Sequence, residues 1–211
     1  RARPDAMPPS EIRPGIAGLI LAGGQGRRLG GRDKALIDLG GKSLVRRAVE
    51  RLSLQAAPLA LSANGDPQRF AALGLPVLPD RIAADAGPLG GIHAGLVWAA
   101  GLGAARLVTV AVDTPFFPAD LVERLSTASG DDNHPTIAAS ADGLHPTFGL
   151  WPVGCAGRLA AFLGDGHRRL GDFAASENAI TVGFAGGTPD PFFNINTADD
   201  LAAARKMLPR A

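Results

Sequence analysis

Apolar residues in this chain follow two patterns, short continuous runs and runs with helical spacing. Residues 16–22 form a continuous apolar run and residues 107–112 a second one that contains a single polar residue, Thr109; such runs are typical of strands covered on both faces. Between them, Leu44, Val45, Ala48, Val49 and Leu52 recur at helical spacing after Ser43, a helix-capping residue type. The alternation of strands and helices predicts an α/β fold with a parallel, doubly wound sheet.

The same patterns predict the remaining elements. Further strands are expected at residues 59–62, 76–79, 136–139, 145–151 and 180–184, and helices at residues 67–73, 158–163, 169–175 and 198–208. A short extended piece at residues 35–39 precedes a glycine turn. Another helix follows the glycine-rich loop 80–91, with Ile92, Leu96, Val97 and Ala99 facing inward. Thr197 and Asp200 have the spacing of a capping box at the start of the last helix.

Composition sets limits on the class of protein. The 211 residues and 46% hydrophobic content fit a single domain over residues 16–211, preceded by a disordered lead-in at 1–15. The net charge of +1 argues against nucleic acid as the main partner. No apolar run reaches the ~20 residues of a membrane helix. The single cysteine, Cys155, suits a reducing cytoplasm and is expected to be structural.

A glycine-rich, basic loop follows the first apolar run. Residues 23–31 contain five glycines, and Arg27, Arg28, Arg32 and Lys34 lie in or just after them. Exposed backbone amides and four cations form a cradle for a polyanion, at the place where an open α/β sheet binds phosphate. Two common nucleotide-binding sequence motifs do not match this region. The dinucleotide motif would need glycine at Leu29, and the P-loop would need it at Leu36.

The residues of this loop also carry a family resemblance. Residues 21–24 (L-A-G-G) with 28–34 (R-L-G-G-R-D-K) resemble the signature of molybdenum cofactor guanylyltransferases, which join GMP from GTP to molybdopterin. The resemblance recurs in the loop at 80–91, at Asp113-Thr114-Pro115, at residues 145–151 and at 194–197, and it covers residues 16–208. It implies a three-layer fold similar to nucleotide-diphospho-sugar transferases, with a mostly parallel sheet and a Rossmann-like nucleotide-binding half.

The candidate catalytic residues are Lys34, Arg28 and Asp113. An aspartate at the carboxyl end of a buried parallel strand points to the crevice where ligands bind, and Mg²⁺ needs only one or two carboxylates plus substrate phosphates. Asp113 is therefore the expected metal ligand, with Mg²⁺ as the expected ion and Mn²⁺ as the alternative. Asp113 could instead cap the turn that it forms with Thr114 and Pro115. Lys34 is the first candidate for the positively charged residue that binds the triphosphate, and Arg28 is the second.

Nucleotide-binding residues are expected at the same edge of the sheet. Asn64 and Asp80 each follow a strand, and their side chains can read a base edge or ribose hydroxyls, or simply form turns. The resemblance implies nucleotide contacts at both. It also implies that backbone groups of the first loop contact the base, at Leu21, Ala22, Gly23 and Gly24.

Pterin-binding residues are expected in the second part of the chain. Asn194 and Asn196 flank Ile195, so in an extended segment both face the same way. They suit either helix capping or the pterin, and the resemblance favours the pterin. His145 is expected either to border the pterin pocket or to be structural. The domain is accordingly divided into a nucleotide half, about residues 16–115, and a pterin half, about 116–208.

The resemblance implies attack by the terminal phosphate of molybdopterin on the α-phosphate of GTP, with release of pyrophosphate. It also implies transient contact with other molybdenum-cofactor proteins and acceptor molybdoenzymes. Three alternatives stay open: a cytidylyltransferase acting on the same pterin, a sugar-phosphate nucleotidylyltransferase, and a non-catalytic nucleotide-binding domain. The cytidylyl family typically reads L-A-A-G where this chain reads L-A-G-G. Leu29 departs from the methionine common in the guanylyl family, which is a volume-conserving exchange.

Overall fold

The computed structural model describes residues 15–23, 25, 26, 32–80, 82, 86–130, 134–187 and 190–208. The disordered lead-in expected at the start of the chain lies outside these residues, apart from Gly15. Gly24, Arg27 and Arg28 also lie outside them, as do Leu29 and Asp85.

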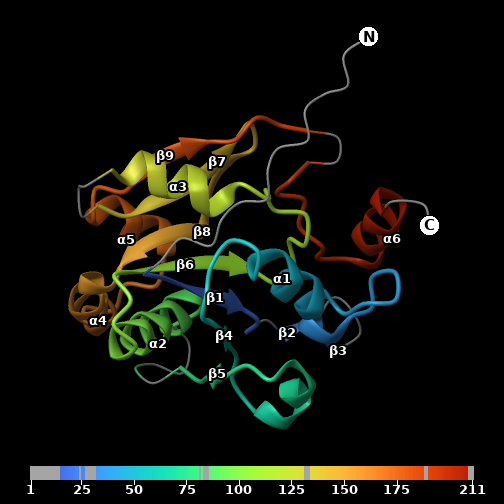
Figure 1. Ribbon diagram of the computed structural model, residues 1–211, viewed down its shortest axis with the longest axis horizontal. Coiled ribbons are helices and arrows are strands. Elements are labelled where there is room, and N and C mark those ends of the chain that lie inside the picture. Colours follow the sequence, from blue (N-terminus) through green and yellow to red (C-terminus); the bar gives the residue numbers. More distant parts are fainter. Residues whose placement is uncertain are drawn as a thin grey trace.

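A seven-stranded sheet forms the centre of the molecule (Figure 1). Its spatial order is β5-β4-β1-β6-β8-β7-β9, and of the described strands in this sheet only β8 runs antiparallel to its neighbours. The strands are β1 (Ile16–Leu21), β4 (Leu59–Ser62), β5 (Val77–Leu78), β6 (Arg106–Ala111), β7 (Thr136–Ser140), β8 (Gly143–Pro152) and β9 (Ile180–Gly183). A separate hairpin pairs β2 (Gln25–Gly26) with β3 (Arg32–Asp33).

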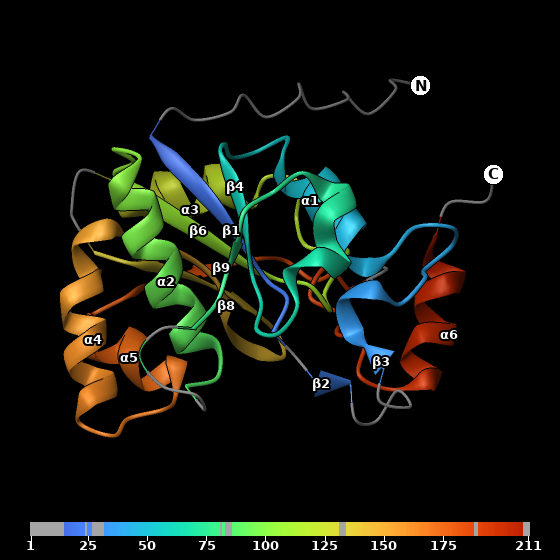
Figure 2. The same cartoon turned by 90° about the horizontal axis from the view of Figure 1, so that it is seen from below.

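Helices cover both faces of the sheet (Figures 1 and 2). One hydrophobic cluster includes residues of α1 (Leu44–Leu52), α3 (Leu121–Ser129) and α6 (Ala198–Met207). The cluster on the other face includes residues of α2 (Pro88–Gly101), α4 (Ala156–Gly164) and α5 (Leu170–Ser176). Short 3-10 helices are η2 (Lys34–Leu36), η3 (Pro67–Leu73) and η4 (Val153–Cys155). The predicted three-layer α/β fold with a mostly parallel sheet is confirmed.

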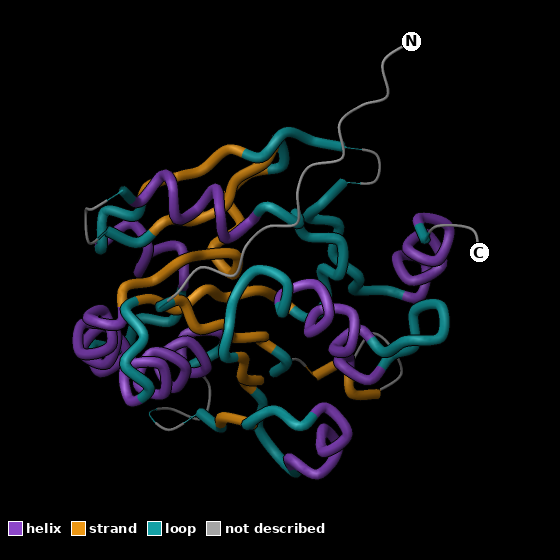
Figure 3. The backbone as a smooth tube through the Cα atoms, viewed as in Figure 1, coloured by secondary structure: helices purple, strands orange, loops and turns teal. Residues whose placement is uncertain are grey.

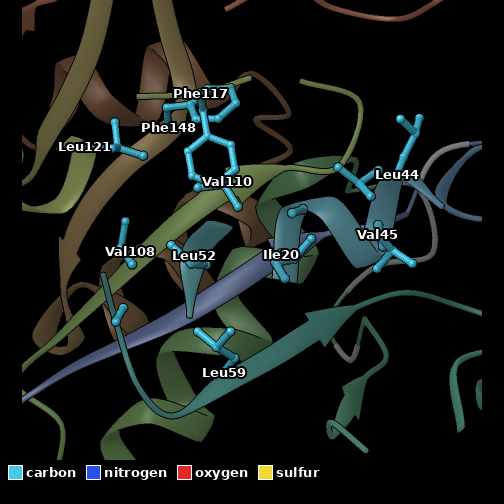
Figure 4. Packing of buried hydrophobic residues seen from close by; sticks show 14 of the residues in the cluster. Ile20, Leu44, Val45, Leu52, Leu59, Val108, Val110, Phe117, Leu121 and Phe148 are labelled. Atoms are coloured by element: carbon cyan, nitrogen blue, oxygen red, sulfur yellow. The ribbon is translucent and has the colours of Figure 1, made fainter. Parts of the chain in front are cut away.

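Strand β1 is buried on both faces, which explains its continuous apolar sequence. Ile20 belongs to the cluster with Leu52 and Val110 shown in Figure 4, whereas Leu19 belongs to the opposite cluster. Helix α2 packs closely over Leu19 because Gly95 has no side chain; a Cβ there would lie 2.6 Å from a Leu19 methyl carbon. The two-sided burial holds β1 firmly, so the loop that follows it starts from a fixed point.

Most predicted elements are confirmed, and the exceptions have physical reasons. The extended piece expected at residues 35–39 is confirmed only in its second part: Ala35 and Leu36 belong to η2, which the Asp33 side chain caps, whereas Ile37 is extended and Asp38 forms an antiparallel bridge with Ser43. Helix α2 begins at Pro88, and Val97 is 49% exposed rather than inward, being one position off the buried face formed by Leu89, Ile92, Leu96 and Ala99. Helix α3 was not predicted. The described residues between β9 and α6 form loops and turns (Figure 3).

Candidate active site at the carboxyl edge of the sheet

The carboxyl ends of four parallel strands lie side by side and carry the candidate residues. Leu21 of β1 is level with Ser62 of β4 and with Ala111 of β6, and Ser62 is level with Leu78 of β5. The loops that follow these strands bring Ala22 and Gly23, Asn64, Asp80 and Asp113 to one edge of the sheet. This is the edge at which open α/β sheets bind ligands.

Lys34 lies at the meeting point of three distant segments. Its Nζ donates to Oδ2 of Asp113 at 2.6 Å and to Oδ1 of Asn196 at 2.7 Å. The residue is only 9% exposed. A lysine is rarely buried unless its charge is paired, and here a carboxylate and an amide oxygen provide the pairing. All three residues were predicted as site residues, but their mutual contact was not.

Asp113 follows β6 after one buried residue, Val112. One carboxylate oxygen faces Lys34, while the other accepts a long hydrogen bond of 3.3 Å from the Thr114 hydroxyl. The side chain keeps 20% of its surface exposed. Asp113 thus caps its turn only through this long hydrogen bond. The carboxylate oxygen that accepts it has spare capacity for a hard cation.

The described carboxylates at this edge of the sheet are those of Asp80 and Asp113. Within the part of the chain that the structure describes, no three or more His, Cys, Asp or Glu side chains form a group that could hold a metal ion. A single carboxylate such as that of Asp113 is enough for a hard divalent cation, because such an ion can take one or two protein carboxylates and complete its shell with substrate phosphates and water.

Asn64 and Asp80 hold each other across the edge. The Asn64 amide nitrogen donates to Asp80 Oδ2 at 2.9 Å, and the Asp80 backbone N–H donates to Asn64 Oδ1 at 2.9 Å. Gly90 of α2 leaves room for this pair, since a Cβ there would lie 2.9 Å from the Asp80 carboxyl carbon. The pair fixes the loops after β4 and β5 relative to each other.

The segment carrying Asn194 and Asn196 is bound to the loop of Asp113. Ile195 is fully buried, and its N–H donates to the carbonyl oxygen of Asp113 at 2.9 Å. Asn194 and Asn196 are both exposed, so they lie on the side opposite to Ile195. Asn196 reaches Lys34, so the two parts of the chain, expected to bind different substrates, meet at this lysine.

The predicted capping box at the start of α6 is confirmed. Asp200 accepts the N–H groups of Asn196 at 2.9 Å and Thr197 at 2.8 Å, and the Thr197 hydroxyl accepts the Asp200 N–H at 3.1 Å. The hydrogen bond from the Asn196 backbone is the main cause that lowers the pKa of Asp200 below its ordinary value. Asp200 therefore orients Asn196, a role that the capping-box spacing alone did not suggest.

His145 mainly contacts neighbouring side chains of the protein. Its ring stacks on Phe192, with centroids 4.2 Å apart, and its Nε2 lies 2.8 Å from the Ser140 hydroxyl oxygen. Burial lowers the pKa of His145, against smaller opposing effects of Asp190 and Asp142. These contacts favour the structural reading, because His145 supports the segment that leads from Phe192 to Asn196.

Two residues near Lys34 were not singled out by sequence reasoning as site residues. Arg69 of η3 forms an ion pair with Asp33, its Nε lying 2.6 Å from Oδ2. Asp33 also caps the short helix that starts at Lys34. The sequence signals for Asp33 were its place in the motif at residues 28–34 and its position next to Lys34; nothing in the sequence indicates that Arg69 reaches it.

The remaining predicted site residues are Leu21, Ala22, Gly23, Gly24 and Arg28. Ala22 is buried, and its N–H donates to the carbonyl oxygen of Ser62 at 2.9 Å, while Gly23 is exposed at the edge. Leu21 closes β1 and is half-buried. Gly24 and Arg28 lie outside the described residues, and so does Asp85, a further acidic residue of the 80–91 loop.

Comparison with known proteins places this site in a family. Residues 18–179 match the model of the MobA-like NTP transferase domain. The chain is 49% identical over 205 residues to a molybdenum cofactor guanylyltransferase from Mesorhizobium japonicum, covering 93% of this chain and 98% of that protein. A second molybdenum cofactor guanylyltransferase, from Cereibacter sphaeroides, is 51% identical over 195 residues, covering 92% of this chain and 97% of the relative.

A solved structure agrees with the fold. Molybdopterin-guanine dinucleotide biosynthesis protein A from Archaeoglobus fulgidus superposes with a TM-score of 0.68 at 23% identity, covering 90% of this chain and 97% of the other. The match to the family model spans most of the residues that build the sheet and carry Lys34, Asn64, Asp80 and Asp113. The chain belongs to the MobA-like NTP transferase domain family.

Proposed function

We propose that this protein transfers GMP from GTP to molybdopterin, giving the guanine dinucleotide form of the molybdenum cofactor and pyrophosphate. The observation that carries the proposal is the position of Lys34, buried at the carboxyl edge of the sheet between Asp113 and Asn196. Lys34 begins η2 and contacts both the loop after β6 and the segment before α6. A nucleotide and an acceptor can meet at this point. The names of relatives about half identical over nearly their whole length support the same reaction.

The nucleotide occupies the edge formed by β1, β4 and β5. Backbone groups of Leu21, Ala22, Gly23 and Gly24 receive the guanine, and Asn64 with Asp80 receive base or ribose polar groups. Lys34 and Arg28 take the triphosphate. Asn64 and Asp80 already bind each other, so they offer a preset pair of polar groups rather than two free side chains. Preorganised groups lose little entropy when the ligand arrives.

The acceptor's terminal phosphate is the nucleophile. It arrives ionised, so no protein base is needed. An oxygen of that phosphate forms a bond to the α-phosphorus of GTP while the bond from this phosphorus to the bridging oxygen of the β-phosphate breaks, and pyrophosphate leaves with the electron pair. Lys34, a charge held beside Asp113 at this edge of the sheet, stabilises the negative charge that develops.

Asp113 would hold the divalent cation. One of its carboxylate oxygens has spare capacity, and the donor set fits Mg²⁺, with Mn²⁺ as the alternative. When bound, the ion neutralises charge on the phosphate oxygens. The contribution of this chain is to keep the carboxylate at the strand end and Lys34 beside it, so that both positive charges face one cluster of phosphates.

The pterin lies on the side of Asn194 and Asn196, with His145 behind them. Both amides are exposed, and Asn196 also contacts Lys34, so the pterin phosphate and the nucleotide phosphate would converge there. The division into a nucleotide half and a pterin half is part of this proposal, with Asn196 at their junction. A cytoplasmic reaction and transient contact with acceptor molybdoenzymes also belong to it. Among the described residues, no helix is long and apolar enough to cross a membrane.

Pyrophosphate release tests the proposal directly. The purified protein is incubated with molybdopterin, Mg²⁺ and each of the four nucleoside triphosphates in turn, with a reaction lacking the pterin as the control. We expect release with GTP that requires the pterin. Preference for CTP would replace the guanylyl assignment with the cytidylyl one, and no pterin-dependent release with any triphosphate would refute the proposed function.

A further inference from the structure

We infer that Arg69 is a positioning residue for nucleotidyl transfer. It ties the segment that carries Lys34 to the loop that carries Asn64, so that the phosphate-binding and base-binding sides of the site form one rigid unit. We call Arg69, Asp33 and Asn64 the Arg69 clamp. The inference rests on the proposed nucleotide site and adds to it a residue outside the strand-end loops.

The guanidinium group of Arg69 makes three contacts in three directions. Its Nε lies 2.6 Å from Asp33 Oδ2, its Nη2 donates to the backbone oxygen of Asn64 at 2.7 Å, and its Nη1 donates to the backbone oxygen of Asp66 at 2.5 Å. The Asp33 and Arg69 side chains are each 24% exposed, so water screens the pair only in part. A guanidinium can hold such a set of acceptors because its donors form a fixed planar fork.

The Asp33 end of the clamp controls the backbone at Lys34. While Oδ2 of Asp33 pairs with Arg69, Oδ1 accepts the N–H of Ala35 at 3.0 Å and caps η2, whose first residue is Lys34. The direction in which the Lys34 side chain leaves the backbone is therefore set by the same carboxylate that Arg69 holds. From there Nζ reaches Asp113 and Asn196.

The Asn64 end of the clamp controls the base-binding side. Arg69 holds the backbone oxygen of Asn64, while the Asn64 amide group is paired with Asp80. Arg69 itself is firmly placed, because the next residue, Phe70, is 1% exposed in the core and its ring lies 4.6 Å from the guanidinium carbon. A core-anchored side chain thus links two loops that would otherwise move independently.

Loss of the clamp should affect catalysis more than folding. Removal of Arg69 also costs some global stability, because its ion pair is only partly screened by water and two backbone oxygens lose their donor, so a control ion pair is needed for comparison. Misplacement of a phosphate-binding cation by about 1 Å can cost on the order of 100-fold in rate. Loss of the Arg69 clamp should therefore weaken GTP binding and slow turnover, with a small change in melting temperature.

The test compares Arg69→Gln, Arg69→Lys, Asp33→Asn and the double variant Arg69→Gln/Asp33→Asn with Arg158→Gln. Arg158 is the control, because its Nη2 lies 2.6 Å from the Glu177 carboxylate in an ion pair that joins α4 to the end of α5, in the layer of the opposite hydrophobic cluster. For each variant, calorimetry measures the Kd for GTP, kinetics measure kcat and KM, and thermal denaturation measures Tm.

We expect Arg69→Gln to raise the Kd and KM for GTP and to lower kcat. The combined effect should reduce kcat/KM by on the order of 10–100-fold. The change in Tm should be no larger than that of Arg158→Gln. Arg69→Lys should recover only a small part of the activity, because an ammonium cannot hold three acceptors. Asp33→Asn should resemble Arg69→Gln, and the double variant should be no worse than either single one.

Additive losses in the double variant, or a kcat/KM for Arg69→Gln equal to that of Arg158→Gln, would overturn the inference while leaving the proposed function intact. If Arg69→Gln fails to fold, Asp33→Asn and Arg69→Lys carry the same comparison, and wild-type values for both overturn it. Failure of the proposed function is distinguishable, because it would appear in the wild-type protein as absence of pterin-dependent pyrophosphate release.

Discussion

Lys34 is a buried cation held by two oxygen atoms, and its position decides the chemistry available to the site. Its side chain is 11% exposed, so its interactions are less screened by water than those of surface lysines. The Asp113 carboxylate keeps it in place before any ligand is bound. A preformed cation of this kind needs no reorganisation at the moment of phosphate transfer.

Lys34→Met tests the cation while keeping most of the side-chain length. We expect kcat to fall by ~10²–10³-fold with a smaller change in the Kd for GTP, because the charge acts most strongly as negative charge develops. Lys42→Met is the matched control, since Lys42 lies 2.7 Å from Glu50 in an exposed ion pair on the surface. Steady-state kinetics in which KM rises but kcat stays constant would make Lys34 a binding residue only.

Asp113→Asn removes the carboxylate charge and keeps the shape. We expect nucleotidyl transfer to be lost and the fold to be retained, because an amide oxygen still accepts the Thr114 hydrogen bond whereas Mg²⁺ depends on anionic oxygen. Calorimetry of GTP binding with and without Mg²⁺ should show tightening by the ion in the wild type and none in the variant. Persistent Mg²⁺-dependent activity would transfer the metal-binding role to another carboxylate, Asp80 first.

At the scale of elements, strands were easier to predict than the short helices around the site. Strands β1 and β6 are buried on both faces, so their apolar runs are direct evidence of their surroundings. Helix η2 depends instead on one side-chain hydrogen bond from Asp33, which local propensity does not reveal. The start of α2 at Pro88 follows the tendency of proline to occupy the first helical turn, a signal that the apolar spacing alone did not use.

The capping box of α6 connects an element boundary to the site. Asp200→Ala should lower the free energy of unfolding, because the N–H groups of Asn196 and Thr197 lose their shared acceptor, while the Thr197 hydroxyl still accepts the N–H of residue 200. It should also reduce kcat/KM, because the Asn196 N–H loses its acceptor and the amide that contacts Lys34 is no longer fixed.

Asp199→Ala is the matched control for this helix end, because Asp199 also lies in the first turn of α6 but is exposed to solvent. Urea denaturation and steady-state kinetics of both variants separate the two effects. A destabilised Asp200→Ala variant with wild-type kcat and KM would show that the cap serves the helix alone.

At the scale of the molecule, single site residues could be predicted but their assembly could not. Lys34, Asp113 and Asn196 stand out individually through motif and strand position. Lys34 is 79 residues from Asp113 and 162 residues from Asn196, so their contact depends on the whole sheet and on the return of the chain after β9. Asn196 was expected on the pterin side only, because sequence distance says nothing about proximity across an edge.

Stability of the whole protein should depend on two histidines with lowered pKa values. Burial lowers the pKa of His93 and of His145 below the ordinary 6.5. The unfolded chain therefore binds protons more readily than the folded one at these positions. Their stabilising contribution is complete above about pH 6.5 and is lost as the pH falls through the lowered folded values.

Replacing both histidines, with His93→Gln and His145→Gln, should flatten this dependence. Urea denaturation at pH 5, 6, 7 and 8 measures the free energy of unfolding of the wild type and of the double variant. We expect a smaller difference between pH 7 and pH 5 in the variant. An equal difference in both proteins would show that other groups account for the loss of stability in acid.

The contact between Lys34 and Asn196 has a consequence for the order in which the protein is made. Domains are synthesised from the N-terminus, and their early segments emerge first. Strands β1, β4, β5 and β6, with the glycine-rich loop, leave the ribosome well before the segment that holds Asn196 and α6. A nascent chain that ends before Asn196 thus already contains all the strands of the seven-stranded sheet and Asp113, whereas Lys34 still lacks its amide partner.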